Sequence, residues 1–229
     1  MDIKLLPEKA ILANGNLIVA DIHIGFEEAA AAEGKYIPKL LKEVISQIQA
    51  IIERERPRRV IINGDLKHSF VPLKREYVEV KTFLENITSL VNEVIVVKGN
   101  HDVGIKWIEN IGAEVLDAFE IGKWKVVHGH RLEEGERFII GHEHPAIRLR
   151  DEVGAVIKVP TFLIGKDIIV LPAFSPWAYG NDITGEIISP ILRTKNINEL
   201  EVHVPLENEI LNFGKLGKLI EALRRLSSI

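Results

Sequence analysis

FIIGHEHPAI, residues 138–147, is the stretch that decides the fold, because an apolar run and a cluster of titratable side chains meet in it. The run Phe138–Ile140 has the β-branched and aromatic side chains of a buried strand, and such runs normally end in turn residues. Here a glycine ends the run, and two histidines flank a glutamate directly after it. The stretch therefore predicts a strand that carries titratable side chains to the edge of a sheet.

Four other short apolar runs end in the same way, each at a residue that can bind a metal. They are NLIVA before Asp21 and His23, RVIIN before Asp65, EVIVVK before Asn100, His101 and Asp102, and KWKVV before His128 and His130. With His142 and His144, the five motifs hold six of the eight histidines. A lone histidine is usually a solvated loop residue or a hydrogen-bonded core residue, but a concentration of this kind indicates a site.

The segments between these runs have helical periodicity. PKLLKEVISQIQAIIERE, residues 38–55, predicts an amphipathic helix with Pro38 in its first turn. Further helices are predicted at Lys74–Leu90 and Ile105–Ile111. Alternating strands and helices indicate parallel strands joined by crossovers, with ligands outside their carboxyl ends. The five motifs are therefore expected to meet at one edge.

The second half of the chain, from about Asp151, has a different pattern. Short strands are predicted in AVIKVPTFLI, DIIVLPAF and ELEVHV, and a closing helix is predicted in LENEILNFGKLGKLIEALRRL, residues 206–226. This half is expected to form another sheet packed on the first. The apolar residues of the closing helix predict ordinary packing or the face of a homodimer.

The chemistry of the five motifs points to a cation. Ionisable groups crowded at one edge are costly unless a cation neutralises them. Carboxylate, imidazole and amide ligands suit first-row divalent metals such as Mn, Fe or Zn better than Ca. There are enough ligands for two metals, and a pair about 3.5–4 Å apart is the usual clamp for attack on a phosphoester. The residues therefore suggest phosphoester hydrolysis.

Composition limits the alternatives. The 229 residues, 46% of them hydrophobic, fit one domain spanning 1–229. A net charge of -4 argues against a generally basic nucleic-acid binder, and the lack of cysteine excludes disulfides and thiolate ligands. The N-terminus does not read as a secretory signal and no run is long enough for a membrane span, so a soluble, cytoplasmic protein is expected. One Met and two Gln lean toward a heat-adapted source.

The ordered motifs DIH, GD, GNHD, a later histidine and GHEH, from Asp21 to His144, resemble those of the calcineurin-like metallophosphoesterases. The resemblance implies an α/β fold in four αββα layers, two mixed β-sheets flanked by helices, here without a separate cap domain. It also implies two divalent metal ions, with Mn expected first and Fe, Zn or Ni as alternatives. The reaction that it implies is attack of a metal-bridging hydroxide on the phosphoester.

The same resemblance implies roles for individual residues. Asp21, His23 and His144 would hold the first metal, and Asn100, His128 and His142 would hold the second, with Asp65 bridging the two. His101 would contact phosphate and protonate the departing oxygen, a task that suits imidazole near neutral pH. Glu143 is expected to point away and to ligate nothing.

His68, in GDLKHSF, indicates the nuclease side of the family. It stands where nucleases of the SbcD type carry a histidine, and a catalytic role is expected for it, although a loop histidine without a role is the alternative. HGHRLEEGE, GHEHPAIRLRD and LPAFSPWAYGND look like the short archaeal SbcD-related branch and like bacterial DNA-repair-associated phosphoesterases of similar length. The large repair nucleases carry a DNA-binding cap after this core, and no such cap is expected in a chain of 229 residues, which argues against the processing of duplex ends. We therefore expect a phosphodiesterase, a DNA or RNA nuclease of repair or processing, with single-stranded nucleic acid as a candidate substrate.

Two other functions remain open at this stage. A phosphomonoesterase or nucleotide phosphohydrolase would share the core chemistry, because substrate choice depends on loops. A non-catalytic scaffold, like the retromer subunit with this fold, ranks lower because that protein lacks the histidine of the GNHD motif, which here is His101.

Outside the motifs, two groups of residues are candidates for substrate contacts. Arg131, Arg148 and Arg150 follow metal motifs and could meet a phosphate backbone. Phe174, Trp177 and Tyr179 either stack a base at the substrate mouth or form core or dimer contacts. The basic run at 54–59 is expected to be a solvated helix end.

Overall fold

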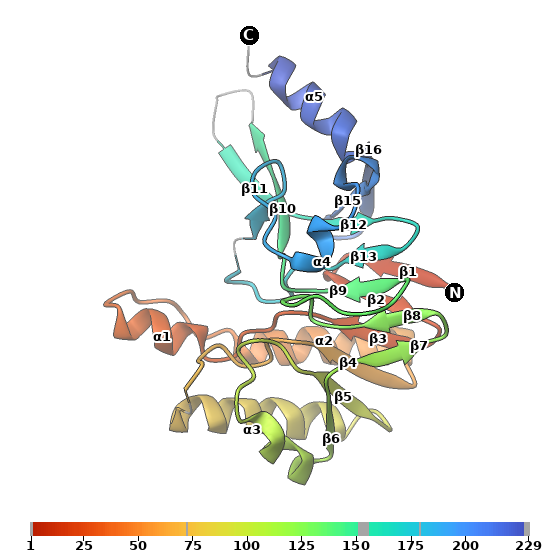
Figure 1. Cartoon of the computed structure of the whole chain (residues 1–229). Coiled ribbons are helices and arrows are strands. Elements are labelled where there is room, and N and C mark those ends of the chain that lie inside the picture. The colour runs from red at the N-terminus through yellow and green to blue at the C-terminus, as the bar shows by residue number, and fades with distance from the viewer. Residues whose placement is uncertain (1, 72, 151–155, 179, 227–229) are drawn as a thin grey trace.

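The computed structural model describes residues 2–71, 73–150, 156–178 and 180–226, and its centre consists of two stacked β-sheets (Figure 1). The first sheet has six strands in the order β1-β2-β3-β4-β5-β6. Their bounds are β1 Ile3–Leu6, β2 Ala10–Ala13, β3 Asn16–Val19, β4 Arg59–Asn63, β5 Val94–Val97 and β6 Ala113–Leu116. Strands β3 to β6 are parallel, as predicted, whereas β1 and β2 add an antiparallel pair at one edge.

Helices on the outer face of this sheet connect its parallel strands. They are α1 Phe26–Ala32, α2 Leu41–Glu55, α3 Lys74–Thr88 and the 3-10 helix η1 Ile105–Ile111. Ile48 and Ile51 of α2 and Phe83 of α3 are fully buried against apolar side chains such as Ile62 of β4. The helix stripe expected from the sequence thus covers one face of the sheet.

The second sheet has seven strands in the order β16-β15-β12-β13-β9-β8-β7. Their bounds are β7 Phe119–Ile121, β8 Trp124–Val126, β9 Phe138–Ile140, β12 Phe162–Ile164, β13 Ile168–Val170, β15 Glu201–Pro205 and β16 Ile210–Lys215. Strands β8, β9 and β13 are parallel and the other pairs are antiparallel. Both central sheets are therefore mixed.

The outer face of the second sheet carries short elements. They are the helices α4 Pro190–Arg193, η2 Ile197–Glu199 and α5 Leu216–Leu226 and a three-stranded sheet of β11 Val156–Pro160, β10 Pro145–Arg150 and β14 Asn181–Asp182. Ile61 faces the second sheet, while its neighbour Ile62 faces the helices, as alternation along a strand requires. The four-layer expectation is confirmed, with a small third sheet within the fourth layer.

Two boundaries differ from the prediction. The residues at 206–209 and β16 are not helical, because β16 pairs antiparallel with β15, and the closing helix begins only at Leu216. A short apolar run can form either structure, and here an available strand edge decides. Pro38 lies outside α2, whose N-cap is Leu40; the backbone N–H of Leu40 donates instead to Glu27 Oε1 at 3.1 Å.

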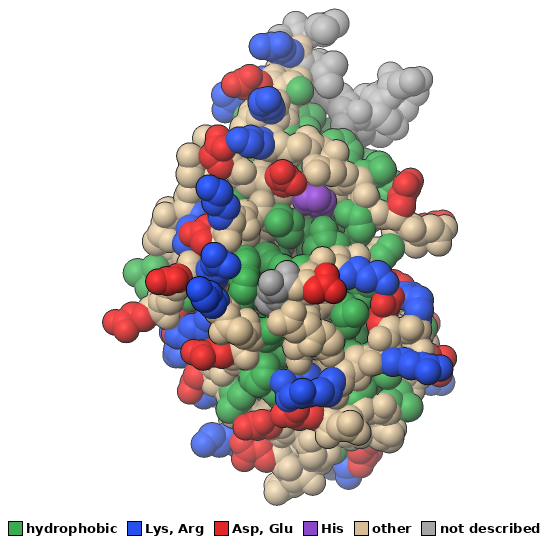
Figure 2. Space-filling model, turned by 90° about the vertical axis from the view of Figure 1, so that its right-hand side faces the viewer, with side chains coloured by type: hydrophobic (Ala, Val, Ile, Leu, Met, Phe, Trp, Pro, Cys, Tyr) green, Lys and Arg blue, Asp and Glu red, His purple; other side chains and the backbone are tan. Residues whose placement is uncertain are grey.

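Surface charge is mixed rather than segregated. On the face shown in Figure 2, basic and acidic side chains are interspersed, in line with the net charge of -4. Within the described ranges, no helix combines the length and the apolar character that crossing a membrane requires.

Candidate metal centre

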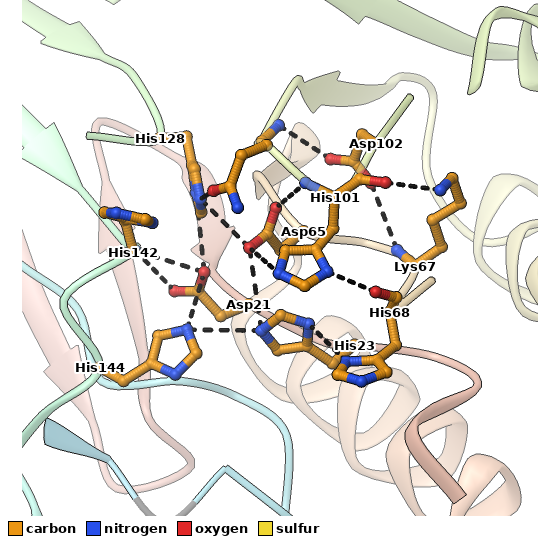
Figure 3. Close-up of polar contacts among 12 residues, drawn as sticks. Asp21, His23, Asp65, Lys67, His68, His101, Asp102, His128, His142 and His144 are labelled. Atoms are coloured by element: carbon orange, nitrogen blue, oxygen red, sulfur yellow. Dashed lines mark hydrogen bonds and ion pairs between the residues drawn. The ribbon is translucent and has the colours of Figure 1, made fainter. Parts of the chain in front are cut away.

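The five motifs meet at one edge of the two sheets, where parallel strands of both sheets end (Figure 3). The first sheet supplies the residues after β3, β4 and β5, and the second sheet supplies those after β8 and β9. They are Asp21 and His23, Asp65, Asn100 and His101, His128, and His142 and His144. Proximity in the sequence did not bring them together, since Asp21 and His144 are 123 residues apart in the chain, yet Asp21 Oδ1 lies 3.1 Å from His144 Nε2.

The backbone at this edge is unusual. Asp21, His23, Asp65, His142 and His144 all have positive φ, between 46° and 62°. Positive φ is uncommon for residues with a side chain and costs free energy, so such residues cluster where a site requires them. Glycines precede Asp65 and His142 and provide room for other side chains. A Cβ on Gly64 would collide with His128, and one on Gly141 would lie 2.5 Å from Asp21 Oδ2. The motifs therefore need glycine because side chains cross directly over it.

A first group of ligand atoms comes from Asp21, His23 and His144. Their candidate ligand atoms lie within 4.8 Å of one another. His144 Nε2 is 3.1 Å from Asp21 Oδ1 and 3.5 Å from His23 Nε2. Asp21 is fully buried, and this combination of a carboxylate and two imidazoles suits a divalent first-row cation.

A second group comes from Asp65, His128 and His142, whose candidate ligand atoms also lie within 4.8 Å of one another. Asn100 Oδ1 joins this group at 3.0 Å from His128 Nε2. Asp65 Oδ2 is 3.3 Å from His128 Nε2 and 3.9 Å from His23 Nε2, so it faces both groups. This is the place that a bridging carboxylate would occupy.

The electrostatics of the protein alone show how closely these groups interact. Burial favours the neutral form of Asp21, but the charges of His144 and His128 outweigh burial and lower its pKa. Burial, followed by the charge of His144, lowers the pKa of His23 to about 3. Burial, followed by the charge of His128, lowers the pKa of His142 to about 4. Ionised Asp21 and neutral His23 and His142 are forms that bind metals. The carboxylates of Asp65 and Asp21 outweigh burial and raise the pKa of His128 to about 9, so this ring would release a proton on binding a cation, and the donor types still fit two cations.

His101 lies beside the two groups and is held on three sides. Its backbone N–H donates to Asp65 Oδ1 at 2.9 Å, and its Nδ1 contacts the carbonyl oxygen of His68. Because a carbonyl only accepts, Nδ1 carries the proton there, and Nε2 lies 3.8 Å from Asp65 Oδ2. The ring stacks on that of His68 with 5.4 Å between the centroids, and the ring of Phe70 lies 4.1 Å from it with a tilt of 31°.

The loops that carry His68 and His101 are tied together by buried charges. Asp102, almost fully buried, accepts from the backbone N–H groups of Gly99 at 2.9 Å and Lys67 at 3.3 Å. Burial raises the pKa of Asp102 to about 6. Lys67 Nζ contacts the carbonyl oxygens of Ser69 and His101, and Glu76 Oε1 accepts from the N–H of His68 at 3.1 Å. Lys67 and Glu76 were missed in the sequence.

The sequence did contain a pattern that could have identified Glu76 as a buried residue. Glu76, Val80, Phe83 and Ile87 follow helical spacing on the buried face of α3, and Glu76 is the charged member of that stripe. A carboxylate on an apolar stripe indicates a specific buried partner. Such a signal could have marked the residue, but not the loop to which it binds.

Glu143 is neither one of the candidate metal ligands nor an exposed side chain; it binds a neighbouring segment of the chain. It is fully buried, and its carboxylate accepts from Asn181 Nδ2 at 2.7 Å and from the backbone N–H groups of Ile188 at 3.0 Å and Ser189 at 2.7 Å. Ser189 Oγ in turn donates to the carbonyl oxygen of Gly129 at 2.8 Å. Segment 188–189 therefore ties the GHEH turn to the HGH turn.

Other candidates from the sequence are not all brought to the centre. Phe174 is 1% exposed in the core beside the helices, so it cannot stack a substrate base, whereas Trp177 borders the cavity described below. Arg131 pairs with Glu133 at 2.8 Å, and Arg148 pairs with Asp182 at 3.1 Å. Tyr179 and the side chain of Arg150 lie outside the described residues.

A cavity of about 480 Å³ opens over both groups of ligand atoms. Asp65, His68, His101 and His144 form part of its wall, and Phe26 and Trp177 form apolar parts. None of the described residues that line the cavity is Lys or Arg. Apart from its histidines, the described lining therefore offers a bound anion no positive side chain, and bound cations would supply the main positive charge there.

Comparison with known proteins gives three findings. The family model described as Calcineurin-like phosphoesterase matches residues 17–198. No curated protein sequence matches the chain. Among solved structures, nuclease MPE from Pseudomonas putida aligns with a TM-score of 0.68 at 20% identity over 92% of this chain and 94% of its own, which is a likeness of fold. YfcE, a phosphoesterase from E. coli, aligns at 12% identity over 87% and 92% with a TM-score of 0.38, too low for any argument.

Proposed function

The chain belongs to the calcineurin-like phosphoesterase family, and from this membership we propose that it hydrolyses phosphodiester bonds and that its substrates are single-stranded nucleic acids. The observation that carries the proposal is the pair of candidate ligand groups, which meet at the wall of a cavity whose described lining contains neither Lys nor Arg. Asp21, His23 and His144 would hold one divalent ion, Asn100, His128 and His142 would hold the other, and Asp65 would contact both.

The protein's own residues would then bind and orient the ester. Two bound cations, Mn first and Fe, Zn or Ni as alternatives, would supply Lewis acidity toward the phosphoryl group. The contact of His101 Nδ1 with the His68 carbonyl keeps one ring proton on Nδ1, so a ring protonated on both nitrogens would deliver the proton of Nε2 to the departing oxygen. His68 supports this ring by stacking and by its carbonyl, in addition to lining the cavity.

The charge of the cavity favours a diester over a monoester. A terminal phosphate carries about two negative charges at neutral pH, whereas a phosphodiester carries one. Sites that bind terminal phosphates commonly add Arg or Lys to the metals, and the described lining has neither. The second candidate, a phosphomonoesterase, is therefore less well supported.

His68 and the motif set further support the SbcD-related branch and a nuclease role in repair or processing. The P. putida protein of similar fold is itself described as a nuclease. The net charge of -4 agrees with a short single strand better than with a long duplex, which requires many phosphate contacts.

The test is turnover of the Mn-loaded protein on bis-p-nitrophenyl phosphate, p-nitrophenyl phosphate and a single-stranded oligonucleotide. We expect kcat/KM to be higher for the diester than for the monoester, and the oligonucleotide to be cleaved. His101→Ala should lower kcat about 10²–10⁴-fold, the usual contribution of a general acid. His203→Ala, on β15 and outside the site, is the matched control.

Two outcomes would refute the proposal. A higher kcat/KM on the monoester would favour the second candidate. Full activity of His101→Ala would remove the role given to its imidazole.

A further inference from the structure

A second pocket, of about 170 Å³, lies between α3 and η1 and contains none of the candidate metal ligands. We call it the Tyr77–Trp107 pocket, after the aromatic residues that line it together with Lys67, Glu76, Leu73 and Val103. The two rings are 4.1 Å apart between centroids and are tilted by 39°. Tyr77 is 46% exposed and Val103 is 58% exposed. Exposed aromatic and apolar side chains around a hollow are suited to a planar ligand.

Two buried charges border the same pocket. Lys67 and Glu76 are 5% and 2% exposed, which is rare for charged side chains without a function or a tight partner. Among the described residues, Lys67 Nζ contacts two carbonyl oxygens, and an ammonium group has three donors. Glu76 Oε1 accepts from the N–H groups of His68 and Ser69, and the Ser69 hydroxyl is a third partner of this carboxylate, which has about four acceptor sites. One donor and one acceptor therefore remain beside apolar walls.

The pocket and the candidate metal centre are lined by neighbouring residues of the same two loops. Lys67 stands two residues after Asp65, and its Nζ contacts the carbonyl oxygen of His101. Val103 stands two residues after His101. The pocket therefore borders the loop of His101, the residue proposed to face the departing oxygen.

We propose that the Tyr77–Trp107 pocket binds one nucleobase of the nucleotide on the leaving side of the scissile phosphate. The inference rests on the proposed function, whose substrate class it specifies. The volume of the pocket is smaller than that of pockets for whole small-molecule ligands, which is about 300–1,000 Å³. The pocket therefore accommodates a single ring system rather than a nucleotide. The rings stack on the base face, and Lys67 and Glu76 meet its polar edge.

A binding experiment tests the pocket without any turnover. The probes are adenosine and thymidine, which have no phosphate and therefore little affinity for a metal centre. The indole N–H signals of Trp107, Trp124 and Trp177 are followed by ¹H–¹⁵N NMR, with Trp107→Phe for assignment. We expect the Trp107 signal to shift with nucleoside concentration and the signal of buried Trp124 to stay. Tyr77→Ala should raise the dissociation constant at least about fivefold, the low end for loss of a base-stacking ring.

The inference is overturned if neither nucleoside shifts the Trp107 signal, if only Trp177 responds, or if Tyr77→Ala binds as tightly as the unmodified protein. Tyr77 is half-exposed, so its removal should leave the fold intact.

A cleavage experiment tests the position of the base. Two oligonucleotides are compared, one intact and one abasic at the nucleotide on the leaving side. For the unmodified protein, kcat/KM should favour the intact strand at least about fivefold, and for Trp107→Ala the ratio should fall to about one. Phe213→Ala, an exposed aromatic on β16, should keep the original ratio.

Equal cleavage of both strands by the unmodified protein overturns the inference. If neither strand is cleaved, the proposed function fails, and the nucleoside titration alone decides whether the pocket binds a base.

Discussion

Two buried glutamates, Glu76 and Glu143, support opposite sides of the candidate metal centre, and each binds a different segment of backbone. On the side of the first sheet, Glu76 comes from a neighbouring helix and binds the backbone of the loop with His68 and Ser69. On the side of the second sheet, Glu143 stands between two histidines that are candidate metal ligands and binds segment 188–189. Glu76 thus supports the side chain proposed for proton transfer, whereas Glu143 supports candidate metal ligands.

The difference teaches that carboxylates of similar burial can serve separate steps. Loss of Glu143 should first affect the affinity for metal, because the turns of His128, His142 and His144 lose their common support. Loss of Glu76 should first affect the rate, because the loop that presents His101 changes while the ligands of both groups keep their places.

Removal of Asp65, which faces both groups of candidate ligands, should have the largest effect on activity. Asp65 Oδ2 lies within 4 Å of imidazole nitrogens of His23, His101 and His128, so Asp65→Ala changes both ligand groups. We expect kcat/KM on bis-p-nitrophenyl phosphate to fall by about a thousandfold or more, since metal clamping stabilises the transition state by several kcal/mol. The exposed Asp117→Ala is the control, and near-normal turnover of Asp65→Ala would contradict the bridging role.

A second substitution removes only the support that Glu143 provides. Glu143→Ala leaves the N–H groups of Ile188 and Ser189 without their acceptor, and we expect the affinity for Mn, measured by calorimetry, to fall about 10–100-fold. Glu186→Ala, in the same loop but 87% exposed, should bind Mn normally. If Glu143→Ala and Glu186→Ala bind Mn equally well, the ligand turns do not depend on this support.

The side of Glu76 should show the opposite pattern. Glu76→Ala removes the acceptor of two loop N–H groups and the charge near Lys67, and small displacements at a reacting centre are costly in rate. We expect kcat to fall about tenfold while the affinity for Mn is retained. Glu85→Ala, on the exposed side of α3, is the control. A loss of Mn affinity with unchanged kcat would show that the two glutamates do not differ as described.

The smallest effect concerns Lys9, which supports the segment that borders Asp21. Its Nζ donates to the carbonyl oxygens of Phe174 at 2.9 Å and Ser175 at 3.2 Å, and burial lowers its pKa from 10.5 to about 8. Because the unfolded chain then binds more protons between these values, the free energy of unfolding should rise with pH from about 8 to 10.5. Lys9→Met should lack this rise in denaturant titrations, and identical pH profiles would contradict the assignment.

Much of the fold and of the site was readable in the sequence. The runs before Asp21, Asp65 and His142 are buried strands as predicted, because an apolar run and its end are local features of the chain. The four-layer architecture and the family were expected from the same motifs and are confirmed.

A distant segment decides the outcome where the prediction was wrong or left alternatives open. β16 is a strand because β15 offers an edge. Of the alternatives for Phe174 the core applies, where its N–H donates to the carbonyl oxygen of Ala20, directly after β3. Nothing within either stretch records these partners.

The sequence by itself determined which residues can hold cations and that they follow strand ends, since both depend on residue type and neighbouring positions. Only the tertiary structure decided that Glu143 binds Ser189, 46 residues away, and that Lys67, Glu76, Tyr77 and Trp107 enclose a pocket. A buried charge must find a partner, but the identity of that partner depends on which segments the folded sheets and helices bring together.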